Sequence, residues 1–275
     1  MKRILTILIC MLGLIFQSLA QGDLLITPRR VVFEGTKQKE ELNLVNIGKD
    51  TAIYFISFIQ YQMKEDGSFV SVETPGPGQM FADPFLRIFP RKVTLAPGEP
   101  QVIMLQCKRK PDMLAGEYRS HLYFRSENKS EPLGMDDKPQ DTTLLAVKLI
   151  PIYGMSIPVI IHSGDAKATS TLSDLKLEIK RDTIQSLKLT INRTGNISLY
   201  GDIVIECTPT VGKTFEIGKV RGVGVYTDIT KRNVVVRLNN TTASALQNGK
   251  LKVKYVTNQE NTKPVVIAEG ELDIK

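Results

Sequence analysis

The chain of 275 residues contains no tryptophan, only three cysteines and only two histidines. With Cys10 of the N-terminal apolar stretch set aside, Cys107 and Cys207 remain, far apart in the sequence and outside any CxxC pair. This scarcity excludes a disulfide framework and favours two separate buried thiols over a single bridge. His121 and His162 lie in no HxxxH spacing, so we expect no metal site.

Catalytic motifs are also missing from the sequence. It contains no GxSxG, no HExxH and no Walker-type phosphate loop. The glycine-rich segment "VRGVGVYTD" at 220–228 is typical of a strand and turn, because no helical pattern follows it. We therefore expect no catalytic residues, no cofactor and no enzymatic activity. The absence of tryptophan also counts against a carbohydrate-binding module.

The charge pattern counts against a nucleic-acid-binding protein. The formal net charge is +7, but basic residues alternate with acidic ones, as in "KQKEE" and "KLEIKRD". No basic run is interleaved with aromatic residues, so we expect no nucleic-acid partner.

The N-terminus has the three parts of a secretory signal peptide. Lys2 and Arg3 provide the charged start, residues 4–16 the apolar run, and residues 18–20 a small-x-small cleavage site before Gln21. No later segment approaches the roughly 20 apolar residues that a membrane span requires. We expect a cleaved signal peptide over residues 1–21, an exported protein and no membrane span.

The remaining chain is dominated by short alternating runs such as "EELNLVN", "QVIMLQC" and "KLKVKYVTN", which recur at roughly ten-residue intervals. This pattern predicts an all-β protein of two β-sandwich domains in tandem. Small and polar residues in "HSGDAKATS" at 162–170 predict the boundary, with domains over 22–163 and 164–275. A long polar loop is expected at 126–141.

Several motifs of the first domain together resemble those of the periplasmic chaperones of fimbrial (pilus) subunits. They are "LLITPRRVVFEG", "LNLVNIG", "DPFLRIFPRKVTLAPGEPQVIML" and "GEYRSHLYFR", and they span most of residues 24–125. The resemblance implies two immunoglobulin-like domains set in an L and a periplasmic location. It also implies that the protein caps fimbrial or pilin-like subunits by donor-strand complementation and delivers them to an outer-membrane assembly usher.

The adjacent Arg29 and Arg30 raise the question of which one has the functional role. Neighbouring side chains of a strand point to opposite faces, so the two cannot share one role. In the similar family, the arginine directly before the "VVF" run holds the C-terminal carboxylate of the client, which implies Arg30 as the anchor. A guanidinium suits this role because its planar fork matches a carboxylate. The alternative is a solvated arginine, or one paired with the nearby Glu34.

The family carries a second anchor, a lysine five residues before a proline in the last strand of the domain. Matching "GMSIPVII" to that strand makes Pro158 the proline and places Tyr153 where the lysine should be. Lys148 lies five residues further back. Either Lys148 or Tyr153 substitutes, or Arg30 holds the carboxylate alone, and Tyr153 also fits a packed core aromatic.

The long apolar run "TTLLAVKLIPIYGMSIPVII" at 142–161 corresponds to the edge strand that these chaperones lend to their client. Leu145, Val147 and Leu149 share one face and are the expected donor residues, while Lys148 on the other face protects an edge. An ordinary buried strand is the alternative, and an exposed donor face would favour self-association. For the whole chain, the rival function is an exported structural or adhesive surface protein built from the same sandwiches.

Overall fold

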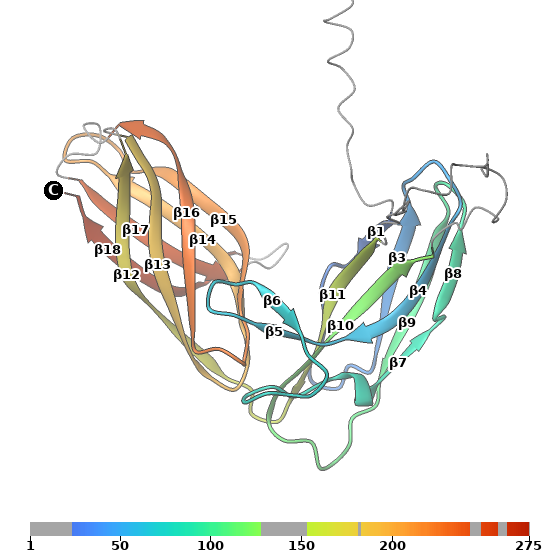
Figure 1. Cartoon of the computed structure of the whole chain (residues 1–275). Coiled ribbons are helices and arrows are strands. Elements are labelled where there is room, and N and C mark those ends of the chain that lie inside the picture. The colour runs from blue at the N-terminus through green and yellow to red at the C-terminus, as the bar shows by residue number, and fades with distance from the viewer. Residues whose placement is uncertain (1–23, 128–152, 181–182, 243–248, 258–262, 275) are drawn as a thin grey trace, which may run out of the picture.

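The computed structural model describes residues 24–127, 153–180, 183–242, 249–257 and 263–274. Apart from one short 3-10 turn at Asp83–Phe85, the elements of these residues are all β-strands, which confirms the predicted all-β class. Among the described residues, no helix has the length and apolar character needed to cross a membrane. The strands form two sandwiches that meet at an angle (Figure 1).

The first domain is a sandwich of two sheets. One sheet contains, in spatial order, β1 (Leu24–Thr27), β3 (Lys39–Asn46), β9 (Pro100–Cys107) and β7 (Leu86–Phe89). The other contains β2 (Val31–Phe33), β11 (Gly154–Ser163), β10 (Gly116–Ser126), β4 (Ala52–Ile59) and β8 (Lys92–Leu95). Read along the chain, this is the A-B-E-D sheet facing the G-F-C sheet of an immunoglobulin-like domain, with the first strand divided between the two sheets.

The second domain repeats this plan with a three-stranded and a four-stranded sheet. The first consists of β12 (Ala168–Lys180), β13 (Thr183–Gly195) and β16 (Lys231–Thr242). The second consists of β15 (Phe215–Val225), β14 (Leu199–Thr208), β17 (Lys250–Thr257) and β18 (Val266–Asp273). Strand structure continues to Ser163 and resumes at Ala168, so the break is shorter than the predicted stretch of 162–170.

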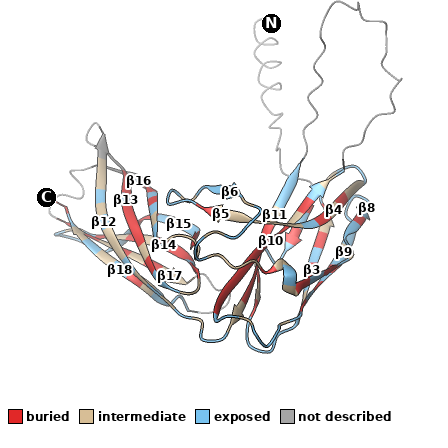
Figure 2. Ribbon diagram, turned by 60° about the horizontal axis from the view of Figure 1, so that its bottom comes forward, coloured by how far each residue is buried: buried red, intermediate tan, exposed pale blue. Residues whose placement is uncertain are grey.

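Each domain has its own hydrophobic core, and the alternation of the sequence determines which residues enter it. In β9, for example, Ile103, Leu105 and Cys107 are buried while the residues between them are exposed (Figure 2). Cys107 belongs to the first core and Cys207 to the second, and both are free thiols. The prediction of two separate buried thiols is therefore confirmed.

Strand β10 departs from simple alternation because nearly all of its residues are buried. Tyr118, Leu122 and Phe124 enter the core of the first domain. Glu117, Arg119 and His121, at the alternate positions, are also buried, although they are polar. A strand buried on both faces needs a cover on each, and the second domain covers this face.

A small hairpin, β5 (Tyr61–Met63) and β6 (Phe69–Ser71), lies in the angle between the domains (Figures 1 and 2). Its turn packs closely on the second domain: a Cβ added to Gly67 would overlap the guanidinium of Arg232. The backbone N–H of Asn233 also donates to Glu65 O at 2.7 Å. The hairpin thus belongs to the first domain and braces it against the second.

Candidate functional site

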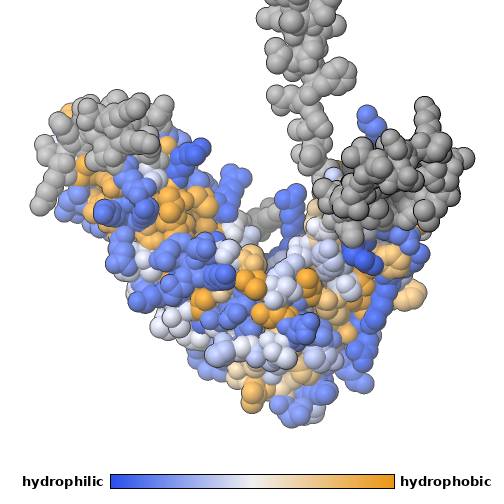
Figure 3. Space-filling model, viewed as in Figure 1, coloured by the Kyte–Doolittle hydropathy of each residue, from blue (hydrophilic) through white to orange (hydrophobic). Residues whose placement is uncertain are grey.

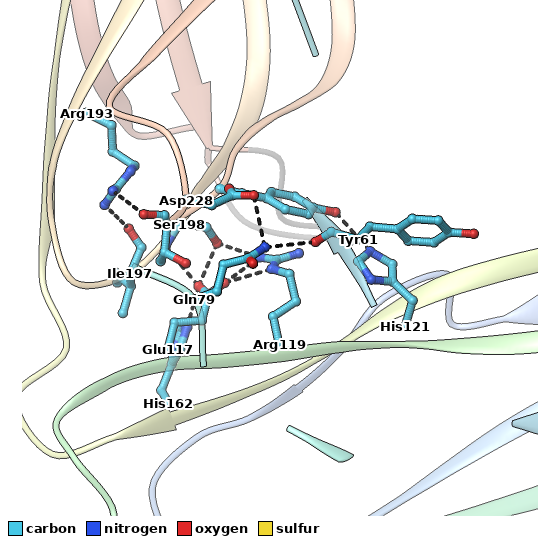
Figure 4. A network of polar contacts seen from close by, with 12 residues as sticks. Tyr61, Gln79, Glu117, Arg119, His121, His162, Arg193, Ile197, Ser198 and Asp228 are labelled. Carbon is cyan, nitrogen blue, oxygen red and sulfur yellow. Dashed lines mark hydrogen bonds and ion pairs between the residues drawn. The ribbon is translucent and has the colours of Figure 1, made fainter. Parts of the chain in front are cut away.

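The junction of the two domains contains the main concentration of buried charge in the described chain. The side chains of Glu117 and Arg119 project from β10 toward loops of the second domain, which carry Ser198 and Asp228 (Figure 4). Figure 3 shows the hollow between the domains, with apolar and polar side chains mixed on its floor. Among the described residues, no cluster of histidine, cysteine or acidic side chains could hold a metal ion.

Glu117 and Arg119 form a buried ion pair. Arg119 donates from Nε and Nη2 to Glu117 Oε1 at 2.8 and 2.6 Å, and Nη2 also donates to Ser198 Oγ at 2.7 Å. The backbone N–H and the hydroxyl of Ser198 donate to Glu117 Oε2 at 2.8 and 2.6 Å. Both carboxylate oxygens therefore have partners, and the pair ties β10 to the second domain.

The electrostatics of this pair follow from its geometry. Burial opposes the ionisation of Glu117, but the charge of Arg119 and the contacts with His162 and Ser198 outweigh it and hold the pKa well below its usual range. Burial likewise opposes the charge of Arg119, and Glu117 more than compensates, which raises the pKa of Arg119. Each group is thus charged because the other is present.

Aromatic rings complete this part of the junction. Arg119 Cζ lies 3.7 Å from the centre of the Tyr226 ring. The Tyr226 hydroxyl is 3.2 Å from His121 Nε2, and Tyr61 packs edge-on against His121. Burial and the charge of Arg119 lower the pKa of His121 to about 3, so this imidazole is neutral at physiological pH.

Asp228 and Arg193 hold the loops of the second domain in place. Asp228 Oδ2 accepts the backbone N–H of Met63 at 2.6 Å and Gln79 Nε2 at 3.1 Å. Arg193 donates to four backbone carbonyls, those of Gly195, Ile197, Thr227 and Ile229. The network therefore orders both sides of the junction. Two of its buried atoms, Asp228 Oδ1 and His121 Nδ1, have no hydrogen-bond partner, and Asp228 lines a small cavity beside Arg119.

Arg30 also faces the junction, but outside this network. The structure places Arg29 and Arg30 in the connection between β1 and β2, not within a strand, so the argument from strand alternation does not apply. Their surroundings nevertheless differ: Arg29 is exposed, whereas Arg30 is half-buried with Cζ 4.6 Å from the centre of the Tyr200 ring of the second domain. Burial and then the charge of Arg119 lower the pKa of Arg30.

Arg30 forms no hydrogen bond or ion pair with any residue that the structure describes. Glu117 is already shared between Arg119 and Ser198. Glu34, the acid considered as a partner from the sequence, lies with Oε1 3.1 Å from His162 Nδ1 instead. A guanidinium that is partly desolvated without an acid offers a site for an external carboxylate.

The structure does not bring Tyr153 to Arg30. Val31 pairs with Val159 of β11, so Arg30 is level with Pro158 and Tyr153 lies five residues earlier, about 17 Å along an extended chain. Its side chain is 67% exposed, which also excludes a packed core aromatic. Lys148 and the expected donor residues Leu145, Val147 and Leu149 lie outside the described residues.

Strand β11 has a partly open edge beside Arg30. β10 pairs with it from Gly154 to Ser163, but β2 pairs only with Val159–Ile161. No described strand covers the other edge of residues 154–158. Arg30 directly precedes β2 and therefore stands where the covered part of the edge ends and the open part begins.

The polar face of β10 was not predicted as part of a site. The segment "GEYRSHLYFR" alternates polar and apolar residues, as does any strand with one face in water. The only available signal was that a glutamate, an arginine and a histidine share one face. Their burial depends on the second domain, which no local pattern reveals.

No protein-family model matches the chain, and no curated protein matches it. Among solved structures, the chain is similar to the YadV chaperone, with 12% identity, 92% of this chain and 100% of that chain covered and a TM-score of 0.46. It is also similar to the E. coli chaperone DraB (9% identity, 92% and 95% covered, TM-score 0.45). A third similar structure is that of the Salmonella enterica SafA pilin in complex with the SafB chaperone (12% identity, 90% and 96% covered, TM-score 0.41).

Proposed function

We propose that this chain is a non-enzymatic periplasmic chaperone that binds and caps fimbrial or pilin-like subunits and delivers them to an outer-membrane assembly usher. Its client is a β-sandwich subunit that lacks a strand, and residues of the 142–161 run supply the missing pairing. Leu145, Val147 and Leu149 are the proposed donor side chains.

The observation that carries this proposal is an unpaired guanidinium at the end of an open strand edge. Arg30 forms no ion pair within the described residues, and the edge of β11 over residues 154–158 begins at its level. A client strand whose C-terminal carboxylate binds Arg30 would extend from it toward Gly154. That strand runs toward Arg30 and therefore parallel to β11, in line with β2, which is also parallel to β11.

Pairing along the edge and binding of the terminal carboxylate supply different parts of the recognition. Backbone hydrogen bonds of an added strand give affinity that is largely independent of sequence. A carboxylate bound by Arg30 fixes the register, because only the end of the client chain carries it. No nucleotide or other cofactor takes part.

A capture experiment tests this function. Full-length protein carrying a C-terminal tag is isolated from periplasmic extract as wild type, Arg30→Ala and Arg29→Ala. We expect a stoichiometric small β-rich subunit with the wild type and with Arg29→Ala. Arg30→Ala should lose it, because removing a charge-assisted contact costs on the order of 2–5 kcal/mol of binding. Equal capture by the two variants would exclude Arg30 as the anchor. If the wild type carries no subunit and is found in a surface fibre instead, a structural or adhesive protein is favoured.

A further inference from the structure

Tyr200, at the start of β14 in the second domain, contacts the guanidinium of Arg30. Arg30 Cζ lies 4.6 Å from the centre of the Tyr200 ring, within the range of a cation–π interaction. The ring is 38% exposed, so it is not a core residue of its own domain. A large exposed aromatic beneath an arginine with no acid requires a reason.

The neighbouring strand makes room for this ring. Tyr200 pairs with Gly224 of β15, and Gly222 lies two residues earlier, at the register shift of this strand pair. A Cβ added to Gly222 would lie 3.0 Å from the Tyr200 hydroxyl, and one added to Gly224 would lie 3.7 Å from Cδ2 of the ring. Gly222 also has a φ of +71°, a conformation that glycine adopts without strain. A side chain at Gly222 would therefore press on the Tyr200 hydroxyl, whereas one at Gly224 would only touch the ring.

We infer that Tyr200 is a positioning residue for Arg30, so that the carboxylate site of the client is built jointly by both domains. This inference rests on the proposed function. The ring supports the guanidinium and limits its rotamers while leaving the planar N–H fork free, because a cation–π contact uses the face of the guanidinium rather than its N–H groups. Tyr200 thereby supplies from the second domain the fixation that Tyr153 is too far away to provide.

The geometry also gives the second domain a part in this site. An arginine in a connection between strands has many rotamers, and ordering it on binding reduces affinity. Arg119 does not substitute for Arg30, because its Nε and Nη2 donate to Glu117 and Ser198 and its side chain is buried. A guanidinium that is ordered before the client arrives binds the carboxylate more tightly.

The test compares two forms of one probe on full-length mature protein. A fluorescein-labelled peptide of alternating valine and threonine is made with a free C-terminal carboxylate and as the C-terminal amide. Binding of both is measured by anisotropy for the wild type, Tyr200→Leu and Tyr200→Phe. The ratio of the two dissociation constants reports the carboxylate contact alone, because strand pairing is common to both peptides.

We expect the wild type to prefer the free carboxylate and Tyr200→Leu to lose roughly five- to tenfold of that preference. Tyr200→Phe should retain it within about twofold, because the ring face is preserved. If the wild type prefers the acid and Tyr200→Leu prefers it equally, the role of Tyr200 is wrong while the Arg30 anchor stands. If the wild type binds both peptides equally, or neither, the proposed anchor itself is overturned.

Discussion

Two arginines of the first domain, Arg119 and Arg30, face the second domain and differ in their partners. Arg119 donates to Glu117 and Ser198 and stacks on Tyr226, and only 8% of it is exposed. Arg30 stacks on Tyr200 but forms no ion pair with any of the described residues. The first arginine is part of the joint between the domains, whereas the second leaves its donors free for a ligand. The proposed function therefore gives the same residue type two different roles, depending on whether the chain provides its counterion.

The largest expected effect concerns the stability of the paired arginine. Arg119→Met leaves the carboxylate of Glu117 buried without its cation, which should lower the free energy of unfolding by about 3–5 kcal/mol. Arg30→Ala should change it by less than about 1 kcal/mol, because it breaks no hydrogen bond or ion pair. Urea unfolding followed by circular dichroism measures both.

A double variant separates the loss of the ion pair from the loss of packing. Arg119→Met combined with Glu117→Leu removes both charges and should recover part of the stability lost in Arg119→Met alone. If Arg30→Ala proves as destabilising as Arg119→Met, the distinction between a structural and a ligand-binding arginine is lost.

Acid should weaken the joint in two stages. His121 has a pKa lowered to about 3 by burial and by Arg119, so its contribution to stability is full above about pH 6.5 and declines below it. Glu117 has a lowered pKa as well, so its contribution is lost below about pH 4.5, the value of the unfolded chain. Burial raises the pKa of Asp228, which acts in the opposite direction. The net expectation is a loss of up to about 1.4 kcal/mol per pH unit between about pH 6.5 and 4.5, and of up to about twice that below pH 4.5, where Glu117 adds to His121.

Thermal or urea unfolding across this pH range tests the prediction, with His121→Gln as the control. This variant should lack the loss of stability that begins near pH 6.5 and retain the loss that begins near pH 4.5, because Glu117 is unchanged. A wild-type stability that stays level as the pH falls toward about 4 would contradict the assignment of a neutral, buried imidazole.

The smallest expected effect distinguishes contact between the domains from backbone strain. Gly78 and Gly98 have nearly the same φ, +75° and +74°, but a Cβ on Gly78 would lie 2.6 Å from Thr227 O, whereas one on Gly98 has nothing within 4 Å. Gly78→Ala and Gly98→Ala therefore share the conformational cost. Gly78→Ala should therefore lower the free energy of unfolding by about 1–2 kcal/mol more than Gly98→Ala does, and this difference measures how closely the domains pack. Equal destabilisation would mean that this part of the junction is not close-packed.

The sequence predicted the general architecture but only part of the site. The period-two runs predict sandwich strands because burial on one face leaves its mark on every second residue, as in β9. The two cysteines read as core thiols for the same reason. Arg30 was identified only through the resemblance of "LLITPRRVVFEG" to a known family. The argument that Arg29 and Arg30 point to opposite faces of one strand was wrong, because the chain changes sheets at this point.

The residues that sequence reasoning missed are those whose environment depends on the other domain. Glu117 and Arg119 look like the solvated face of a strand until a second sandwich covers them. Tyr200 and the glycines beside it lie in β14 and β15, more than a hundred residues from Arg30 in the chain. The alternation of polar and apolar residues shows which face of a strand enters the core of its own domain, but it does not show which surface of another domain covers the opposite face.

The central claim is that Arg30 binds the terminal carboxylate of a client strand lying on the open edge of β11. A crystal structure of the protein with its captured subunit tests it most directly. We predict a strand parallel to β11 over residues 154–158, with its terminal carboxylate about 2.7–2.9 Å from the Arg30 guanidinium nitrogens. A client strand that runs antiparallel, or whose carboxylate lies away from Arg30, would contradict the account.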